Sequence, residues 1–351
     1  MPSTSTPIRV GLVGFGASGR YFHSPYLAAD PAYRLEMIAT ANEERAAQAR
    51  AEHPDAAIVA GPHDVLDRAG DLDLVVLGTP PQTHCDLALS ALQAGLAVVV
   101  DKPFVPTVVE AKQLIQAADA AGRPLVVFHN RRYDGDFRTV QNLVRSGALG
   151  DIHRFESTFE RWSGPLRERW QDATPVPQGG GISYDLGSHL VDQALQLFGP
   201  AEVEHAEVRG LRDGAVADDD ATIWLRHLSG TRTHLTMSRV AGQTGPRFRV
   251  LGARGAYSSY GLDRQESQLH AGMRPGEFGF GVVPEEGWGM LGAGASLQRI
   301  PTERGDYGLF YAQLAETLLE GAPAPVDARD ALEVVRIIER AHAVSAAAAS
   351  V

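Results

Sequence analysis

Lys102 is one residue of this chain whose type and position could serve acid–base chemistry. It stands between Asp101 and Pro103, just after an apolar run, and the proline ring fixes the backbone of the turn. An ammonium group held in one place can polarise a substrate oxygen or pass a proton. The alternative is a solvated lysine in a surface turn. Its position beyond a buried strand makes Lys102 a candidate catalytic residue.

A second candidate group is formed by Asp185, His189 and Asp192. Their offsets of four and seven residues predict one face of a helix over residues 183–198, which Gly199 and Pro200 would end. A histidine beside carboxylates can act as a base near neutral pH, because a carboxylate sets its tautomer and stabilises its cation. The trio could instead be a solvated helix face, or a metal site of the kind that holds non-haem iron or manganese. The residues alone leave these three interpretations open.

A glycine-rich turn near the start of the chain could hold an anionic cofactor. The pattern G-x-G-x-x-G follows an apolar run and precedes a helical stretch, and its residues are Gly14, Phe15, Gly16, Ala17, Ser18 and Gly19. In a dinucleotide site these glycines allow a tight turn, close approach of a pyrophosphate, and close packing of helix on strand. The helix then directs free N–H groups at the anion. An ordinary glycine-rich turn is the alternative, but the position between strand and helix favours a phosphate site.

The elements that must position these groups follow a βα alternation from Ile8 to about Phe128. Strands are expected at 9–14, 35–40, 72–78, 97–100 and 124–128, with helices at 83–94 and 107–121. This pattern is typical of a parallel sheet, whose ligands bind beyond the carboxyl ends of the strands. Besides the glycine turn and Lys102, the expected cofactor-binding residues at these ends are Thr40, Asn42, Arg45, Thr79, Pro80, Pro81, His84, Asp101 and Asn130.

After about residue 130 the pattern changes to longer alternating strands. We expect them at 155–160, 202–209, 221–227, 231–240 and 248–251, in an antiparallel α+β arrangement. Residues 272–294 are expected to form a long loop or lid, and two final helices are expected at 307–319 and 328–344. The chain is therefore divided into a dinucleotide-binding domain, 1–128, and a second domain for substrate binding and oligomerisation, 129–351.

Composition restricts the possible partners. A chain of 351 residues is long enough for two cores, and a formal charge of -11 opposes binding to nucleic acid or anionic lipid. Cys85 is the only cysteine, which excludes an intrachain disulfide and a multi-cysteine metal cluster. The N-terminal residues lack the features of a signal peptide, and there is no run of 18 apolar residues. A soluble cytoplasmic protein without a membrane partner is expected.

Taken together, these motifs resemble the Gfo/Idh/MocA family of NAD(P)-dependent oxidoreductases, and within it the branch of scyllo-inositol dehydrogenases. The resemblance is carried by residues 14–20 with Phe22 and His23, by 101–103, by 129–134 and by 184–189. It implies an α/β protein with an N-terminal Rossmann domain and a C-terminal α/β domain built on a large, mostly antiparallel open sheet. It also implies a homodimer or homotetramer that associates through that sheet. Asp101 stands where the family usually has glutamate.

The resemblance also implies an activity and a catalytic set. In the family, the lysine of a Glu-Lys-Pro motif and the aspartate and histidine of an Asp-x-Gly-x-His motif are catalytic, and these map onto Lys102, Asp185 and His189. We expect transfer of a hydride between a nicotinamide and a carbinol carbon of a sugar, inositol or related polyol. His189 would take the hydroxyl proton, Lys102 would stabilise charge on oxygen, and Asp185 would orient His189 or the substrate. Besides these three, the candidate substrate-binding residues are Arg131, Arg161, Arg169, Trp170 and Tyr184.

The cofactor is expected to be NADP or NAD. An NAD site usually presents a carboxylate at the end of the second strand, whereas an arginine there accommodates a phosphate. Here Asn42 occupies this place, with Glu43, Glu44 and Arg45 close behind, which favours NADP slightly. No metal site is expected. The alternatives are a noncatalytic nucleotide-binding regulator and a metal-dependent sugar isomerase or lyase.

Overall fold

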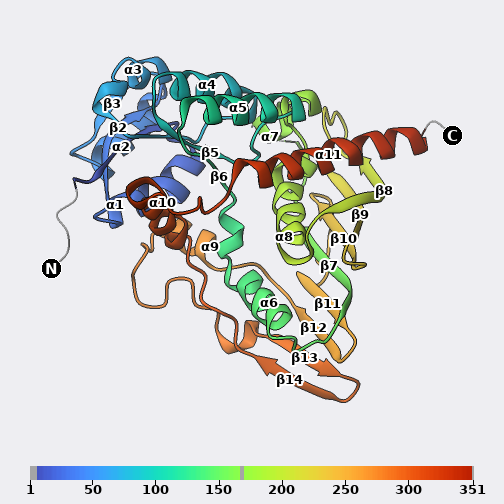
Figure 1. The fold of residues 1–351 in the computed structure, drawn as a ribbon. Coiled ribbons are helices and arrows are strands. Elements are labelled where there is room, and N and C mark those ends of the chain that lie inside the picture. Colours follow the sequence, from blue (N-terminus) through green and yellow to red (C-terminus); the bar gives the residue numbers. More distant parts are fainter. Residues whose placement is uncertain (1–5, 167–169, 350–351) are drawn as a thin grey trace.

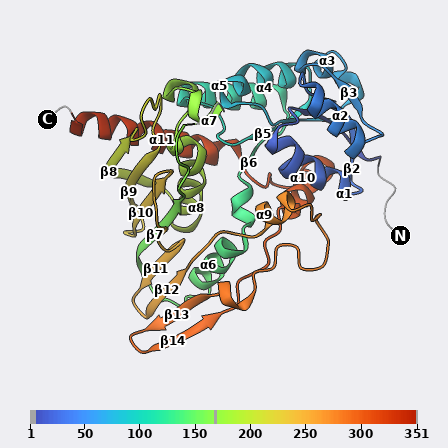
Figure 2. The ribbon, with the colours of Figure 1, turned by 180° about the vertical axis from the view of Figure 1, so that it is seen from behind.

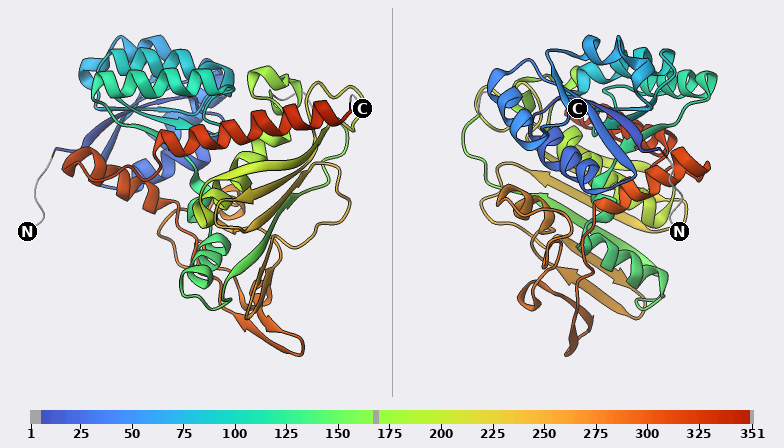
Figure 3. Two further views of the ribbon diagram at one scale, coloured as in Figure 1. Left: turned by 45° about the vertical axis from the view of Figure 1, so that its right-hand side comes forward. Right: turned by 90° about the vertical axis from the view of Figure 1, so that its left-hand side faces the viewer.

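The computed structural model describes residues 6–166 and 170–349. The chain forms two sheets with helices packed around them, and the long helix α11 (Ala328–Ala349) runs from one sheet to the other (Figures 1 and 3). This α/β architecture, with a parallel sheet followed by a larger and mostly antiparallel one, confirms the expected fold class.

The first sheet contains six parallel strands in the order β3-β2-β1-β4-β5-β6. The strands are β1 (Ile8–Val13), β2 (Tyr33–Ala39), β3 (Ala57–Val59), β4 (Leu74–Leu77), β5 (Ala97–Asp101) and β6 (Leu125–Phe128). The helices between them are α1 (Ser24–Ala29), α2 (Glu43–Glu52), α3 (Pro62–Leu66), α4 (His84–Gln93) and α5 (Val108–Ala121). The strand order reverses between β1 and β4, which is the place where such sheets bind ligands.

Strands β4, β5 and β6 are short apolar runs because both faces of this sheet are covered. All of their residues are buried. Helix α5 shows how the sequence sets an element's limits: Thr107 and Glu110 form a reciprocal capping box at its start, and Gly122, at φ 59°, ends it. Strand β5 ends at Asp101, so the loop that follows it, with Lys102, lies at the carboxyl edge of the sheet.

The second sheet contains eight strands in the order β14-β13-β12-β11-β7-β10-β9-β8, antiparallel except for the β7–β10 pair. The strands are β7 (Ile152–Glu160), β8 (Ala201–Arg209), β9 (Asp220–His227), β10 (Arg232–Ser238), β11 (Phe248–Gly252), β12 (Gly255–Ser259), β13 (Gly289–Ala293) and β14 (Ser296–Ile300). The helices between β6 and α11 are α6 (Gly135–Arg145), α7 (Trp170–Ala173), α8 (Ser188–Phe198), α9 (Gln265–His270) and α10 (Gly308–Glu320). Residues of α6, α8 and α11 share one apolar core with the sheet.

Three expectations from the sequence need correction. The structure contains strands at β3 and β12–β14 that the sequence patterns do not indicate, and β13 occupies part of the segment 272–294, which is therefore not a loop throughout. These strands are short and half exposed, so they lack the apolar alternation that marks the others. The expected helix over 183–198 consists of a π-helical turn, Ser183–Gly187, followed by α8.

The last two helices tie the two sheets together. Tyr307, Phe310 and Tyr311 of the α10 region pack into the core of the first sheet, beside α1 (Figure 2). Helix α11 contributes Ala331 and Val335 to the first core and, among others, Ile337, Ile338 and Ala341 to the second. In the described part of the chain, no helix combines the length and the apolar character that crossing a bilayer requires.

His23 lies at the contact between the first sheet and α10 and yields a prediction for stability. Its ring is buried against Phe128, with Nδ1 2.6 Å from the hydroxyl of Tyr311, and burial lowers its pKa to about 4. An unfolded histidine has a pKa of about 6.5, so between these pH values only the unfolded chain takes up this proton. We expect this one residue to cost about 3 kcal/mol of unfolding free energy as the pH falls from 7 to 4.

The measurement is chemical denaturation of the wild type and of His23→Phe across that range. As the pH falls, the unfolding free energy of the wild type should decrease relative to that of the variant. The variant also loses the contact with Tyr311, which should change its unfolding free energy by the same amount at every pH. A pH-independent difference between the two proteins would contradict the prediction.

Candidate active site

A cavity of about 900 Å³ lies at the carboxyl ends of the first sheet's strands and extends to α8 and α9. It is large enough for a dinucleotide part and a small second ligand. Of the residues expected from the sequence, those that line it are Gly14, Phe15, Gly16, Ala17, Ser18, Thr40, Asn42, Arg45, Thr79, Pro80, Asp101, Lys102, Asn130, Arg131, Arg161, Asp185 and His189. Residues far apart in the sequence thus line the same cavity.

The glycine turn is shaped to admit a phosphate group. Gly14 has φ +98°, and a Cβ there would lie 2.7 Å from the carbonyl oxygen of Gly78. A Cβ on Gly19 would lie 2.0 Å from the oxygen of Gly14, so only glycine permits this contact between turn and helix. Gly16 lines the cavity, and its Cβ position is free of backbone neighbours. These features fit a dinucleotide pyrophosphate held by the backbone.

At the end of β2, the described residues that line the cavity include the cation Arg45 and no carboxylate. Asn42 caps α2, with its Oδ1 accepting from the Arg45 N–H at 2.9 Å. The Arg45 side chain reaches the cavity wall, and in the described ranges it forms no ion pair. Glu43 and Glu44 are exposed and do not line the cavity. This end therefore offers a positive charge where a ribose would lie.

Lys102 and Asp185 meet at the opposite end. The Lys102 Nζ donates to Asp185 Oδ1 at 2.9 Å and to the Asp185 carbonyl at 3.0 Å, and Arg239 donates to Oδ2 at 2.5 Å. Burial raises the pKa of Asp185, but the charges of Lys102 and Arg239 outweigh it and hold that pKa well below its ordinary value. The carboxylate is therefore ionised and holds both cations in place.

His189 lies beside this pair in the cavity wall. Its side chain is only 3% exposed, and Nδ1 is buried without a hydrogen-bond partner among the described residues. Burial, followed by the charges of Lys102 and Arg131, lowers its pKa well below the ordinary value. The imidazole is therefore neutral at pH 7, so that one of its ring nitrogens carries a lone pair.

The two carboxylates of the trio, Asp185 and Asp192, bind cations and form no hydrogen bond with His189 among the described residues, which corrects the interpretation of the trio. Asp185 contacts Lys102 and Arg239, and Asp192 accepts three hydrogen bonds from Arg132, at 2.6, 2.9 and 3.2 Å. A charged donor binds a buried carboxylate more strongly than a neutral imidazole does, which explains this choice of partners. Among the described residues, no group of three or more His, Cys, Asp or Glu side chains is arranged to hold a metal ion.

Several expected site residues do not reach the cavity. Gly19 and Pro81 are buried and do not line it. The buried ring of His84 lies 2.8 Å from the Thr79 carbonyl and 2.9 Å from that of Phe104, so it links the loops after β4 and β5. The buried Tyr184 donates its hydroxyl to the Pro106 carbonyl at 2.7 Å. Arg169 and the side chain of Trp170, which begins α7, lie outside the described residues.

The structure adds lining residues that were not among the expected site residues, and they include Phe22, Leu186, Arg239, Glu266 and His270. Arg239 stands two residues after the apolar Met237 in the predicted strand 231–240. Alternate residues of a strand share a face, so this spacing could have marked Arg239 as facing the interior. Glu266 and His270 come from α9, a six-residue helix without a clear periodic signal. Their place in the site depends on long-range contacts.

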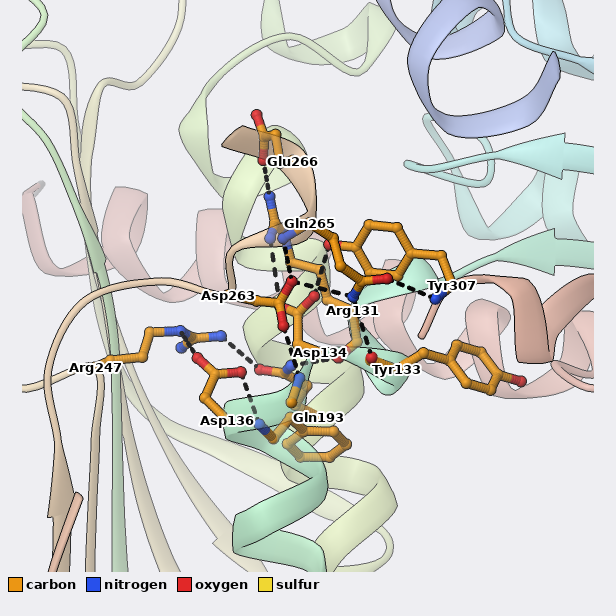
Figure 4. A network of polar contacts seen from close by, with 12 residues as sticks. Arg131, Tyr133, Asp134, Asp136, Gln193, Arg247, Asp263, Gln265, Glu266 and Tyr307 are labelled. Carbon is orange, nitrogen blue, oxygen red and sulfur yellow. Dashed lines mark hydrogen bonds and ion pairs between the residues drawn. The ribbon is translucent and has the colours of Figure 1, made fainter. Parts of the chain in front are cut away.

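A buried polar network, drawn in Figure 4, fixes α9 against the cavity. Arg131 donates to Glu266 at 2.6 Å and forms an ion pair with Asp134 at 3.3 Å. The Tyr307 hydroxyl also donates to Asp134, whose pKa burial raises to about 7. Gln265, the neighbour of Glu266, accepts from the Tyr307 N–H at 2.8 Å. The network thus holds Glu266 and Arg131 in one arrangement at the cavity wall.

Comparison with known proteins places this geometry in a family. Residues 8–129 match the family model of the GFO/IDH/MocA oxidoreductases for an NAD-binding Rossmann fold, and residues 141–348 match that for the family's C-terminal alpha/beta domain. The chain is 37% identical to the uncharacterised oxidoreductase YdgJ of Escherichia coli, over 95% of both chains. It is 34% identical to the scyllo-inositol 2-dehydrogenase (NADP(+)) IolW of Bacillus subtilis, over 95% of this chain and 92% of that one.

Solved structures agree with these matches. The oxidoreductase yvaA of Bacillus subtilis superposes with a TM-score of 0.90 at 34% identity and covers 97% of both chains. The YPO2259 oxidoreductase of Yersinia pestis gives a TM-score of 0.89 at 37% identity, over 99% of this chain and 97% of that one. Both domains, their order and the sheet architecture are therefore shared along nearly the whole chain. The chain belongs to the GFO/IDH/MocA family of oxidoreductases.

Proposed function

We propose that this enzyme transfers a hydride between a nicotinamide dinucleotide and a carbinol carbon of a sugar, inositol or related polyol. The observation that carries the proposal is the convergence of Lys102, Asp185 and His189 in the cavity that also contains the glycine turn. A phosphate-binding turn and a proton-accepting group in one space are what such a dehydrogenase needs. A noncatalytic nucleotide-binding protein would have no use for that group.

The residues around Lys102 have different roles in the reaction. When bound, a nicotinamide supplies the acceptor for the hydride that leaves the carbinol carbon. The neutral imidazole of His189 takes the hydroxyl proton as the alcohol becomes a ketone, and the Lys102 ammonium stabilises negative charge that develops on the oxygen. Asp185 positions Lys102, since both of its side-chain oxygens are engaged by cations. In the reverse direction the same groups reduce a ketone.

The substrate class is supported by the polar wall and by a relative. Arg131, Arg161 and Glu266 line the cavity near Lys102 and can pair with hydroxyl groups. The relative IolW is named as a scyllo-inositol 2-dehydrogenase. The test is a panel of inositols, sugars and sugar alcohols, followed by nucleotide absorbance with both NAD⁺ and NADP⁺. Turnover of at least one cyclic or linear polyol is expected, and turnover of none would remove the proposal.

We further propose NADP as the preferred cofactor, because Arg45 lies at the end of β2 without an ion-pair partner in the part of the chain that the structure describes. Arg45→Gln should weaken NADP⁺ binding by about 10- to 100-fold, the value of one hydrogen bond to a charged group, and should change NAD⁺ binding much less. Fluorescence titration with both nucleotides measures this. Asn42→Asp is the matched variant, since a carboxylate there should favour NAD⁺. Equal losses for both nucleotides in Arg45→Gln would contradict the assignment.

We also propose a homodimer or homotetramer that associates through the eight-stranded sheet. The face of this sheet turned away from α8 carries Trp224, 43% exposed and stacked on His234, next to an ion pair between Arg249 and Glu156. A surface that mixes an aromatic side chain with paired charges is compatible with burial against a second copy.

A further inference from the structure

Two arginines at the catalytic end lie over one buried ring. The guanidinium carbon of Arg131 is 4.9 Å, and that of Arg161 5.1 Å, from the centroid of Phe159 on β7. The ring attracts both cations, and a stacked guanidinium keeps its in-plane N–H groups available for a planar anion. Arg161 is further fixed by its own backbone N–H, which donates to the Ser238 carbonyl at 2.9 Å. The cavity wall thus presents two cations in set positions.

Only one of these two arginines forms ion pairs with carboxylates of the described residues. Arg131 forms ion pairs with Glu266 and Asp134, as Lys102 does with Asp185. Arg161 lines the same cavity, yet within residues 6–166 and 170–349 its guanidinium forms neither a hydrogen bond nor an ion pair with a carboxylate. It is half-buried in a chain with a formal charge of -11, so its lack of a counter-ion does not follow from a shortage of acids.

Arg161 nevertheless lies close to the reacting groups. Its charge helps to lower the pKa of both Asp185 and Glu266, so it lies near both carboxylates while bonding to neither. A partly buried cation that lines a cavity and has no ion-pair partner among the described residues is available to bind a ligand's negative charge. A singly charged planar group suits this position, because Asp185 and Glu266 nearby would repel a phosphate dianion.

We infer that the substrate carries a carboxylate that Arg161 binds, so that the polyol is a sugar acid such as a uronate or an aldonate. The inference rests on the proposed function and narrows its substrate class. The carboxylate is a recognition group and is unchanged in the reaction. The carbinol carbon loses a hydride to the nicotinamide and its hydroxyl proton to His189, as for a neutral polyol. Glu266, which accepts from Arg131 through Oε2, can accept a substrate hydroxyl through Oε1.

The test compares matched acid and neutral substrates in wild type and variants. The pairs are D-glucuronate with D-glucose and D-gluconate with D-sorbitol, measured as initial rates with NADP⁺. We expect kcat/KM of the wild type to favour the acid of at least one pair by about tenfold or more, and Arg161→Gln to lower that acid-to-neutral ratio by about 10- to 100-fold, through KM. Arg161→Lys, which keeps the charge, should restore part of the ratio. Arg68→Gln, at an exposed arginine paired with Asp71, is the control and should keep the wild-type ratio.

Two failures can be told apart. If neutral polyols are oxidised as well as their acids, or if Arg161→Gln leaves the ratio unchanged, the inference is wrong and the proposed function stands. If neither member of any pair is oxidised, nor any polyol of the wider panel, the proposed function fails. Calorimetric titration with D-glucuronate then decides the role of Arg161: binding lost in Arg161→Gln supports it, and equal or absent binding in the two proteins overturns it.

Discussion

Replacing His189 or Lys102 with alanine is expected to lower kcat for polyol oxidation by about 10²- to 10⁴-fold, the usual contribution of a positioned acid or base. The reason is geometric: both side chains line the catalytic end of the cavity, and Lys102 is held by two bonds to Asp185. Stopped-flow and steady-state measurements with the best substrate of the panel give kcat, and fluorescence titration gives the dissociation constant of NADPH.

The two variants should keep the dissociation constant of NADPH within about threefold of the wild-type value. The glycine turn and Arg45, which we propose to bind the phosphates of the nucleotide, line another part of the cavity. His63→Ala, at an exposed histidine on α3, is the control and should retain wild-type kcat. Near-normal turnover in both active-site variants would remove the assigned roles. A large loss in cofactor affinity would instead indicate that these residues bind the nucleotide and do not act on the substrate.

Arg132→Met is expected to destabilise the fold by about 3–5 kcal/mol, because it leaves the carboxylate of Asp192 buried without its partner. The Arg132 side chain is 10% exposed and that of Asp192 only 3%, and Arg132 also contacts Asp330 at 3.1 Å. Burial raises the pKa of Asp192, but the charge of Arg132 outweighs it and lowers that pKa below its ordinary value, so the group is ionised in the native state. Guanidinium denaturation followed by circular dichroism measures the shift in midpoint.

Two further variants test whether the loss of stability comes from the buried ion pair. The double variant Arg132→Met with Asp192→Leu removes both charges and should recover most of the lost stability, since an apolar pair can replace a buried ion pair. Arg329→Met removes the exposed ion pair with Asp119 and should leave the midpoint almost unchanged. If Arg132→Met were as stable as Arg329→Met, the ion pair would not be a structural element of the fold. If the double variant were no better than the single one, lost packing would explain the effect.

Much of the fold follows from local sequence signals. The strands of the first sheet are buried on both faces and therefore appear as short apolar runs, and α5 has its cap residues at both ends. Strand β13 could not be recognised, because its register depends on other strands. A Cβ on Gly289 would lie 2.3 Å from the Tyr257 hydroxyl, so this glycine is required by a residue on β12 and not by its own neighbours.

Only part of the candidate site could be predicted from the sequence. Lys102 and the glycine turn follow strands of a parallel sheet, so their place at its carboxyl edge could be inferred from topology alone. The partners of Asp185 and Asp192 could not, because Arg132 and Arg239 reach them from other elements. Helical spacing shows which side chains share a face, but it does not show which cations that face meets. Glu266 belongs to the site through Arg131 and the network around Tyr307, which no local pattern reveals.

Helix α11 restricts how the molecule can move around its ligands. One continuous helix places apolar side chains in both cores, with Val335 in the first and Ile337 and Ile338 in the second. Pulling the domains apart along this helix would have to break its backbone hydrogen bonds or expose those side chains to water. We therefore expect relative motion of the two domains to be small, so that substrate exchange would depend on local opening of the cavity wall.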